Sequence, residues 1–501
     1  MRLLFCCEFY FPSVGGVQEV MRQIAERLVQ RGHDVTVATT RLGDRTFTEH
    51  NGVKIAEFGV TGNIVRGMEG EVERYRQFVR SFECDAILIK AAQQWTFDAL
   101  WPDLDEISAR KMFIPCGFSG LFEPSYSDYF EAMPDVLRKF DHLVFYAESY
   151  RDTDFARRNG ISQFSILANG ASEIEFGVSR DATFRQRNSI PEDSFVLLTV
   201  GSLTGVKGHR ELLEAFVRLK TNSRHVTFIM NGNPPPQPVV VKQASTSDGQ
   251  NAPPEAGQAP SLCPPVWTRA TDVFRVEGFR GIGSRLSGRL HHWSRRAARF
   301  RRLGESVQRV WIEEGWIGIR MRLLQRIGPR LERAGLLRYL SPSAREYANP
   351  LAYWMAEAQA QSTAKRLIVS NYSRDELVQA YMAADLFVFA SNIEYSPLVL
   401  FETVAAGTPF LSVPVGNAEE IARWTGGGII CPAVKDERGY TRVSPAVLAR
   451  EIAKSIEDPE KLDLLGAAGH AAWKERFTWD AIATRYEVLL RGAGEAHEKV
   501  Y

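Results

Sequence analysis

The length, composition and charge of the chain set the first limits on what it is. Its 501 residues are enough for about two or three domains, each with a core of its own. A hydrophobic fraction of 45%, a charged fraction of 24% and a net charge of +1 describe an ordinary globular protein without a bulk attraction to nucleic acid. No apolar run reaches the roughly 20 residues that cross a bilayer, so we expect no membrane-spanning helix.

The cysteines and the first residues bear on the compartment. None of the six cysteines stands in a Cys-x-x-Cys pair or at a spacing typical of zinc sites or disulfide frameworks, so reduced thiols are expected. Residues 1–8 are too short in apolar length for a signal peptide and are interpreted as a buried strand. We expect a cytoplasmic protein, with peripheral contact to the inner face of the membrane as an open alternative.

Residues 1–176 alternate short apolar strands with amphipathic helices, which is typical of a doubly wound sheet. Strands are predicted at 86–89, 112–114 and 143–145. The first helix is predicted from apolar residues that share one face at a spacing of about 3.6 residues, namely Val17, Val20, Met21, Ile24, Ala25 and Leu28. Before it stand Gly15 and Gly16, which lack a Cβ and allow a ligand to approach the backbone.

A second α/β series is predicted to form a domain from residues 190–233 and 366–475. It begins with a strand at 195–200, a helix at 210–220 and a strand at 226–230, and it resumes with a strand at 366–369. Ser373 and Glu376 then form a capping box for the next helix. The loop after the first of these strands holds Lys207 between Gly201 and Gly208, where its ammonium group suits a diphosphate.

Residues 234–365 interrupt this series and are interpreted as an insertion. Residues 234–265 are rich in Pro, Gln, Ser and Gly, which is typical of a disordered linker. Residues 266–345 carry many arginines, and one predicted helix places Leu286, Leu290, Trp293, Ala297 and Phe300 opposite Arg295, Arg299 and Arg302. Such a basic amphipathic helix suits an anionic membrane surface, although an arginine run is also typical of a solvated face. No contact with nucleic acid is expected.

The segment Ser391–Pro409 is the most informative part of the chain. It follows the apolar run 386–390, which suits a parallel strand buried on both faces, and Ser396-Pro397 favours the start of a helix. The N-terminus of a helix at this edge favours an anionic diphosphate. Glu394 and Glu402, with seven residues between them, can accept hydrogen bonds from hydroxyl groups. The pattern predicts a sugar-nucleotide site.

These motifs, in this order, resemble the family 4 glycosyltransferases, which belong to glycosyltransferase group 1 and have the GT-B fold. Besides the two glutamates, the similar segments are the glycine loop at 9–17, the segment 167–170 and the phosphate-binding loop at 200–208. The segment 167–170 ends in Asn169-Gly170, which we interpret as a turn rather than as a ligand-binding pair. The resemblance implies an α/β protein with two Rossmann-like doubly wound domains that face a cleft, and with the basic, partly helical insertion in the second domain. It also implies that the helix in 476–501 crosses back onto the first domain.

The resemblance also implies an activity and a role for each site residue. A retaining enzyme would move a glycosyl group from a nucleotide-diphosphate sugar to a glycan or lipid-linked acceptor, in cell-surface polysaccharide or glycoconjugate synthesis. No metal, no other cofactor and no protein nucleophile is expected. Glu394 and Lys207 would be catalytic. The donor would be bound by Gly16, Ser202, Lys207, Glu394, Tyr395, Ser396, Pro397, Leu398 and Glu402, and the acceptor side would be formed by Gly15, Cys116 and Gly117.

Two positions depart from the family pattern. Ser202 stands where the family usually has an arginine, so a bidentate phosphate clamp is missing. Cys116 stands where the family tends to have a histidine, and a thiol does not replace an imidazole in hydrogen bonding. Two alternatives therefore stay open, namely a catalytically weak GT-B protein that binds a glycan or partner, and a transferase that acts on a small sugar phosphate.

Overall fold

The structure is a computed structural model that describes residues 1–221, 224–232, 341–361, 364–437 and 439–492. Contacts divide the chain into two compact units, Met1–Pro235 with Trp354–Tyr501, and Pro236–Tyr353. The predicted linker at 234–265 and the predicted arginine-rich helix lie outside the described residues. From the predicted insertion the structure describes two helices, α10 (Pro342–Ala348) and α11 (Pro350–Gln359).

The first sheet contains eight strands among the described residues, in the order β10-β9-β8-β7-β1-β2-β4-β3. They are β1 (Arg2–Cys6), β2 (Asp34–Thr40), β3 (Glu49–His50), β4 (Val53–Phe58), β7 (Ala86–Lys90), β8 (Arg110–Ile114), β9 (His142–Phe145) and β10 (Phe164–Ile166). Only β3 runs antiparallel to its neighbour. The chain extends the sheet from β1 toward β4 and then continues on the other side of β1 with β7, which places a switch point between β1 and β7.

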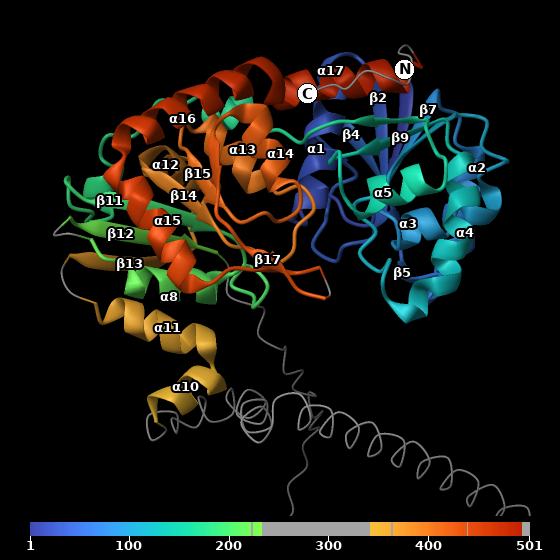
Figure 1. Ribbon diagram of the computed structural model, residues 1–501. Helices are drawn as coiled ribbons and strands as arrows, with labels where there is room; N and C mark the ends of the chain where they lie inside the picture. The colour runs from blue at the N-terminus through green and yellow to red at the C-terminus, as the bar shows by residue number, and fades with distance from the viewer. Residues whose placement is uncertain (222–223, 233–340, 362–363, 438, 493–501) are drawn as a thin grey trace, which may run out of the picture. The chain divides into compact units, whose positions relative to one another are not determined.

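The helices of this part connect the strands and cover the sheet (Figure 1). They are α1 (Gly16–Gln30), α2 (Val72–Ser81), α3 (Trp95–Asp98), α4 (Ser127–Arg138) and α5 (Arg151–Arg158), and a hairpin is formed by β5 (Val60–Asn63) and β6 (Gly67–Gly70). The short helices α6 (Glu173–Phe176) and α7 (Phe184–Arg187) follow β10 and contact α12 (Arg374–Ala383) of the second α/β series. The predicted apolar face of α1 is buried from Val20 to Leu28, while Val17 is half-buried. Two further short turns are Trp101–Asp103 and Pro124–Tyr126.

The second sheet contains six parallel strands in the described part of the chain, in the order β13-β12-β11-β14-β15-β16. They are β11 (Phe195–Val200), β12 (Val226–Asn231), β13 (Lys365–Ser370), β14 (Leu386–Phe389), β15 (Phe410–Ser412) and β16 (Gly428–Ile430). All four residues of β14 are buried, as expected for a strand covered on both faces. The switch point of this sheet lies between β11 and β14, which pair directly.

Four helices accompany this sheet, and a small antiparallel ribbon follows it. The helices are α8 (His209–Arg218), α12 (Arg374–Ala383), α13 (Leu398–Ala405) and α14 (Ala418–Thr425), and the ribbon pairs β17 (Val434–Lys435) with β18 (Thr441–Arg442). The predicted cap of α12 is present, because the Ser373 hydroxyl accepts a hydrogen bond from the Glu376 N–H at 3.4 Å. Pro397 is the residue directly before α13.

The chain ends in helices α15 (Pro445–Glu457), α16 (Pro459–Ala472) and α17 (Trp479–Leu490), with a π-helical turn at Trp473–Phe477. Helix α17, drawn in red in Figure 1, returns to the first sheet and lies near α1 and β2. Its Trp479, Ile482, Tyr486 and Leu490 belong to one buried cluster with residues of β1 and α1. The last helix therefore completes the core of the first sheet.

Candidate functional site

The loops that follow β11 and β14 meet at the switch point of the second sheet. Lys207 Nζ lies 2.6 Å from Glu394 Oε1, and the same oxygen accepts a hydrogen bond from Ser391 Oγ at 2.8 Å. The Asn392 N–H donates to the carbonyl of Val206 at 2.8 Å, which joins the two loops through their backbones. The structure therefore brings together the two residues that the sequence predicts to be catalytic.

Gly208 explains how these loops come so close. Its φ is +71°, and a Cβ at this position would lie 1.9 Å from the carbonyl oxygen of Ala390. A side chain would therefore be both strained and in collision with the loop that carries Glu394. The residue also precedes α8, so it fixes the start of that helix and the position of Lys207 together.

Glu402 projects from the second turn of α13 and is held by two donors. Arg374 Nη2 lies 2.7 Å from Glu402 Oε1, and the Tyr381 hydroxyl donates to Oε2 at 2.9 Å. Arg374 also pairs with Glu175 at 2.7 Å. Burial alone would lower the pKa of Arg374, but the two carboxylates more than offset this effect and the pKa is raised. Glu402 is thus fixed in one orientation before any ligand binds.

A cavity of about 880 Å³ lies between the loops at the two switch points. Most of the predicted site residues line it, namely Gly15, Gly16, Cys116, Ser202, Lys207, Glu394, Tyr395, Ser396, Pro397, Leu398 and Glu402. Gly117 does not line it. It packs against Tyr395 instead, since a Cβ on Gly117 would lie 3.2 Å from that ring, and its N–H donates to Asp152 Oδ2 at 2.7 Å.

Residues of the first sheet hold the segment around Glu394 in place. The Tyr395 hydroxyl accepts a hydrogen bond from the Tyr146 N–H at 2.9 Å and also bonds to Asp152. The Tyr150 hydroxyl donates to the carbonyl of Glu394 at 2.7 Å. Burial raises the pKa of Asp152 to about 6, although its hydrogen bonds from Tyr395 and from backbone N–H groups oppose this rise.

Three cationic residues of the cavity were not predicted from the sequence. They are Arg22 of α1, Lys90 at the end of β7 and Arg374 at the start of α12. They bring positive charge to a site where Ser202 supplies none. The positions of Lys90 and Arg374 in the sequence could have indicated their role, because each follows the carboxyl end of a predicted parallel strand. Asn169, interpreted as a turn residue, also lines the cavity, and its amide donates to the carbonyl of Ser396 at 3.2 Å.

The described residues contain neither a candidate metal site nor a candidate membrane span. Within that part of the chain, no three His, Cys, Asp or Glu side chains are grouped so that they could hold a metal ion. Among the same residues, no helix has the length and apolar character that crossing a membrane requires.

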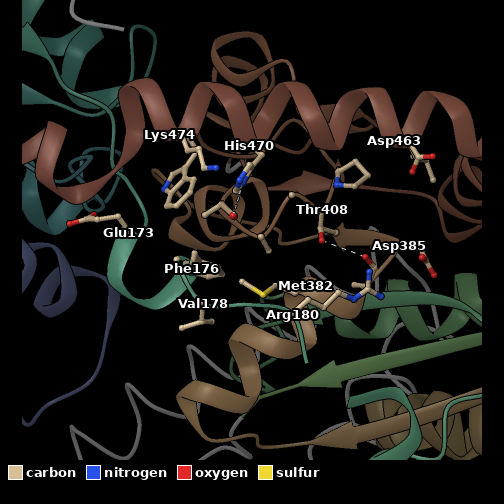
Figure 2. Close-up of a pocket in the computed structure, with 18 of the residues that line it drawn as sticks. Glu173, Phe176, Val178, Arg180, Met382, Asp385, Thr408, Asp463, His470 and Lys474 are labelled. Carbon is tan, nitrogen blue, oxygen red and sulfur yellow. Dashed lines mark hydrogen bonds between the residues drawn. The ribbon is translucent and has the colours of Figure 1, made fainter. Parts of the chain in front are cut away.

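A second cavity, of about 720 Å³, lies beside α16 and contains none of the predicted site residues (Figure 2). His470 Nδ1 hydrogen-bonds to the carbonyl of Ala405 at 2.9 Å, and the Thr408 hydroxyl donates to the carbonyl of Tyr381 at 2.6 Å. Because these polar groups already have partners within the protein, we place the functional site in the 880 Å³ cavity.

Solved structures show which fold the chain shares. Sucrose-phosphate synthase from Thermosynechococcus elongatus superposes with a TM-score of 0.60 at 17% identity, covering 98% of both chains. HepE of Anabaena, solved with UDP-glucose, gives a TM-score of 0.55 at 14% identity, with 98% of this chain and 100% of that chain covered. WaaG, a glycosyltransferase involved in lipopolysaccharide biosynthesis, gives a TM-score of 0.55 at 15% identity, with 98% of this chain and 100% of that chain covered. The predicted GT-B fold, with two Rossmann-like sheets, is confirmed.

Sequence comparison finds relatives of one segment of the chain. Residues 353–471 match the family of glycosyl transferases group 1. A D-inositol 3-phosphate glycosyltransferase of Streptomyces bingchenggensis is 36% identical over 124 residues, which are 24% of this chain and 25% of that protein. The enzyme of the same name from Thermobispora bispora is 34% identical over 128 residues, or 25% and 27% of the two chains. The matches thus span about a quarter of each curated relative. This segment thus matches the group 1 glycosyltransferases, the family that the sequence motifs resemble.

Proposed function

We propose that this protein is a retaining, metal-independent glycosyltransferase of family 4 that uses a nucleotide-diphosphate sugar as donor. The observation that carries the proposal is the meeting of Lys207, Glu394 and Glu402 with the glycine loop Gly15–Gly16 in one cavity of about 880 Å³. This volume is in the range of small-molecule sites, and the cavity opens at the carboxyl ends of parallel strands, where open α/β sheets bind ligands.

Each group has a place in the proposed reaction. The bond between the anomeric carbon and the diphosphate breaks, a bond to the acceptor oxygen forms on the same face, and the acceptor proton passes to the leaving phosphate. Lys207 and the first N–H groups of α13 stabilise the charge on the diphosphate. Glu394 accepts hydrogen bonds from the sugar hydroxyls and Glu402 from the ribose hydroxyls. No side chain is needed as a nucleophile.

The acceptor is a hydroxyl-bearing molecule that enters from the side of the first sheet. A glycan or lipid-linked acceptor in cell-surface synthesis remains our first candidate. A small sugar phosphate is the second, and it is supported by the names of the relatives, which are D-inositol 3-phosphate glycosyltransferases.

The donor can be identified by thermal-shift measurements with UDP-, GDP-, ADP- and TDP-sugars. We expect one nucleotide to stabilise the wild type and to lose this effect with Glu402→Ala, because the ribose hydroxyls then lack their acceptor. Val488→Ala, an exposed change on α17, is the control and should leave the shift intact. If no nucleotide stabilises the wild type, the protein is a binding module and the proposed activity is wrong.

A further inference from the structure

Lys90 is a buried cation that the proposed donor site does not use. It is the last residue of β7, at the switch point of the first sheet, and only 1% of it is exposed. It nevertheless lines the 880 Å³ cavity. Its Nζ donates to the Tyr146 hydroxyl at 2.7 Å. Among the described residues no carboxylate forms an ion pair with it, so one of its three N–H groups has a protein acceptor.

A buried ammonium group without a carboxylate partner is costly in free energy. Burial lowers the pKa of Lys90 to about 8, and the facing groups that oppose this shift are the thiols of Cys116 and Cys7. The Tyr146 ring, 5.0 Å from Nζ, adds only a weak attraction. These neighbours do not neutralise the lysine. An anion from outside the chain would do so.

The same cavity holds other polar atoms that have no partner. Asn169 Oδ1 and Ser396 Oγ are buried and make no hydrogen bond within the described structure, and both residues line the cavity. Ala91 and Cys116, which follow β7 and β8, have φ angles of 72° and 61°. Such left-handed conformations are unfavourable for residues other than glycine and concentrate at functional sites. The cavity that Lys90 lines thus also contains unsatisfied polar groups, and residues with left-handed backbone follow β7 and β8.

We propose that Lys90 binds a negatively charged group of the acceptor, either a phosphate or a carboxylate. The assignment of this group to the acceptor rests on the proposed function, whereas the anion site itself does not. Lys207 serves the diphosphate from the second sheet, whereas Lys90 lies on the first sheet beside Cys116, on the predicted acceptor side. A neutral acceptor would leave the buried charge unsatisfied. The site therefore selects an anionic acceptor. Lys90 supplies the hydrogen-bond donor that the Cys116 thiol cannot supply.

The test is calorimetric titration of the full chain with inorganic phosphate, glucose 6-phosphate, glucuronate and glucose. The variants are Lys90→Met, the charge-retaining Lys90→Arg, Lys207→Met, and Lys461→Met as an exposed control. Each is measured with and without a saturating nucleoside diphosphate. We expect Lys90→Met to weaken binding of the anionic probes about ten- to hundred-fold, and Lys90→Arg and Lys461→Met to retain it. The preferred probe, phosphate or carboxylate, identifies the acceptor group.

Several results would overturn the proposal. One is unchanged anion binding in Lys90→Met; another is anion binding that depends on Lys207 or is abolished by the nucleotide, since the anion would then occupy the donor site. A third is the absence of any anion binding to the wild type. Thermal melting checks that Lys90→Met is folded, and we expect its melting temperature to equal or exceed that of the wild type. Lys90-dependent phosphate binding without any nucleotide binding would refute the proposed donor and leave the anion site standing.

Discussion

At the scale of single residues, the pairing of Lys207 with Glu394 raises the question of what the lysine does when the donor arrives. One of its three N–H groups is directed to Glu394 at 2.6 Å, and both side chains are partly exposed to the cavity. The remaining N–H groups can bind phosphate oxygens without breaking this pair. The carboxylate therefore orients the lysine and also remains available to a sugar hydroxyl.

We expect Lys207→Met to lower kcat/KM for the donor by about 10²-fold, because the leaving diphosphate loses a preorganised charge. The measurement is the initial rate of glycosyl transfer with the donor that the thermal-shift panel identifies. Lys461→Met, on the exposed side of α16, should leave the rate unchanged. Equal rates for Lys207→Met and the wild type would remove Lys207 from the proposed mechanism.

Asp152 gives a prediction about pH. Its pKa is raised from 3.8 to about 6 by burial, so the folded state binds this proton more tightly than the unfolded state does. The contribution of Asp152 to the free energy of unfolding should therefore grow as the pH falls from about 7 to about 4. A difference of about 2 in pKa corresponds to about 3 kcal/mol.

Asp152→Asn removes this titration and keeps a side chain of similar size. The stability of the wild type relative to Asp152→Asn should rise toward low pH, as measured by urea unfolding at intervals between pH 4 and pH 8. A difference in stability that does not vary with pH would show that Asp152 is already ionised throughout this range in the folded protein.

At the scale of elements, glycines in the loops between strands and helices set how closely these loops can approach one another. Gly208 and Gly407 both have left-handed backbones, with φ angles of 71° and 75°. A Cβ on Gly208 would lie 1.9 Å from the carbonyl oxygen of Ala390, whereas a Cβ on Gly407 would meet no atom within 4 Å. A substitution of Gly407 therefore costs only the strained backbone conformation, whereas a substitution of Gly208 also costs the close contact between the two loops.

We expect Gly407→Ala to destabilise the protein by about 1 kcal/mol, since only the left-handed conformation is penalised. Gly208→Ala should cost about 1–3 kcal/mol more, because the loops must separate. It should also lower activity, since Lys207 moves with its loop. Chemical unfolding and initial rates measure the two effects. Equal destabilisation by both substitutions would mean that the loop after β14 moves away from the new Cβ without a loss of stability.

At the scale of the whole molecule, α17 links the end of the chain to the first sheet. Trp479 is 2% exposed and belongs to the buried cluster of β1 and α1, whereas Val488 on the same helix is 43% exposed. We expect Trp479→Ala to destabilise the protein by about 3–5 kcal/mol and Val488→Ala by no more than about 0.5 kcal/mol. Thermal melting of the two variants checks this. A small effect of Trp479→Ala would mean that the first sheet folds without the last helix.

The sequence by itself determined the elements and their order. Burial could be predicted from local patterns such as the apolar run 386–390 and the apolar face of α1. This is possible because the periods of strands and helices involve residues that are close in sequence. The α/β class followed from the alternation of strands and helices, and the resemblance to the group 1 glycosyltransferases from motifs around Gly15, Lys207 and Glu394. Most of the predicted site residues line one cavity because each follows a parallel strand, and the carboxyl ends of parallel strands share one edge of a sheet.

Only the tertiary structure decided which side chains meet across the two sheets. The hydrogen bond between Tyr395 and the Tyr146 backbone joins positions 249 residues apart, and no local pattern encodes such a contact. The ion pair between Arg374 and Glu402 could not be predicted either. In the sequence Arg374 only follows a helix-capping serine, and its contact with Glu402 appears only in the folded chain. Lys90 ends an apolar strand, where a lysine would ordinarily reach solvent. Its burial, and thus its chemistry, depends on the residues that close over it.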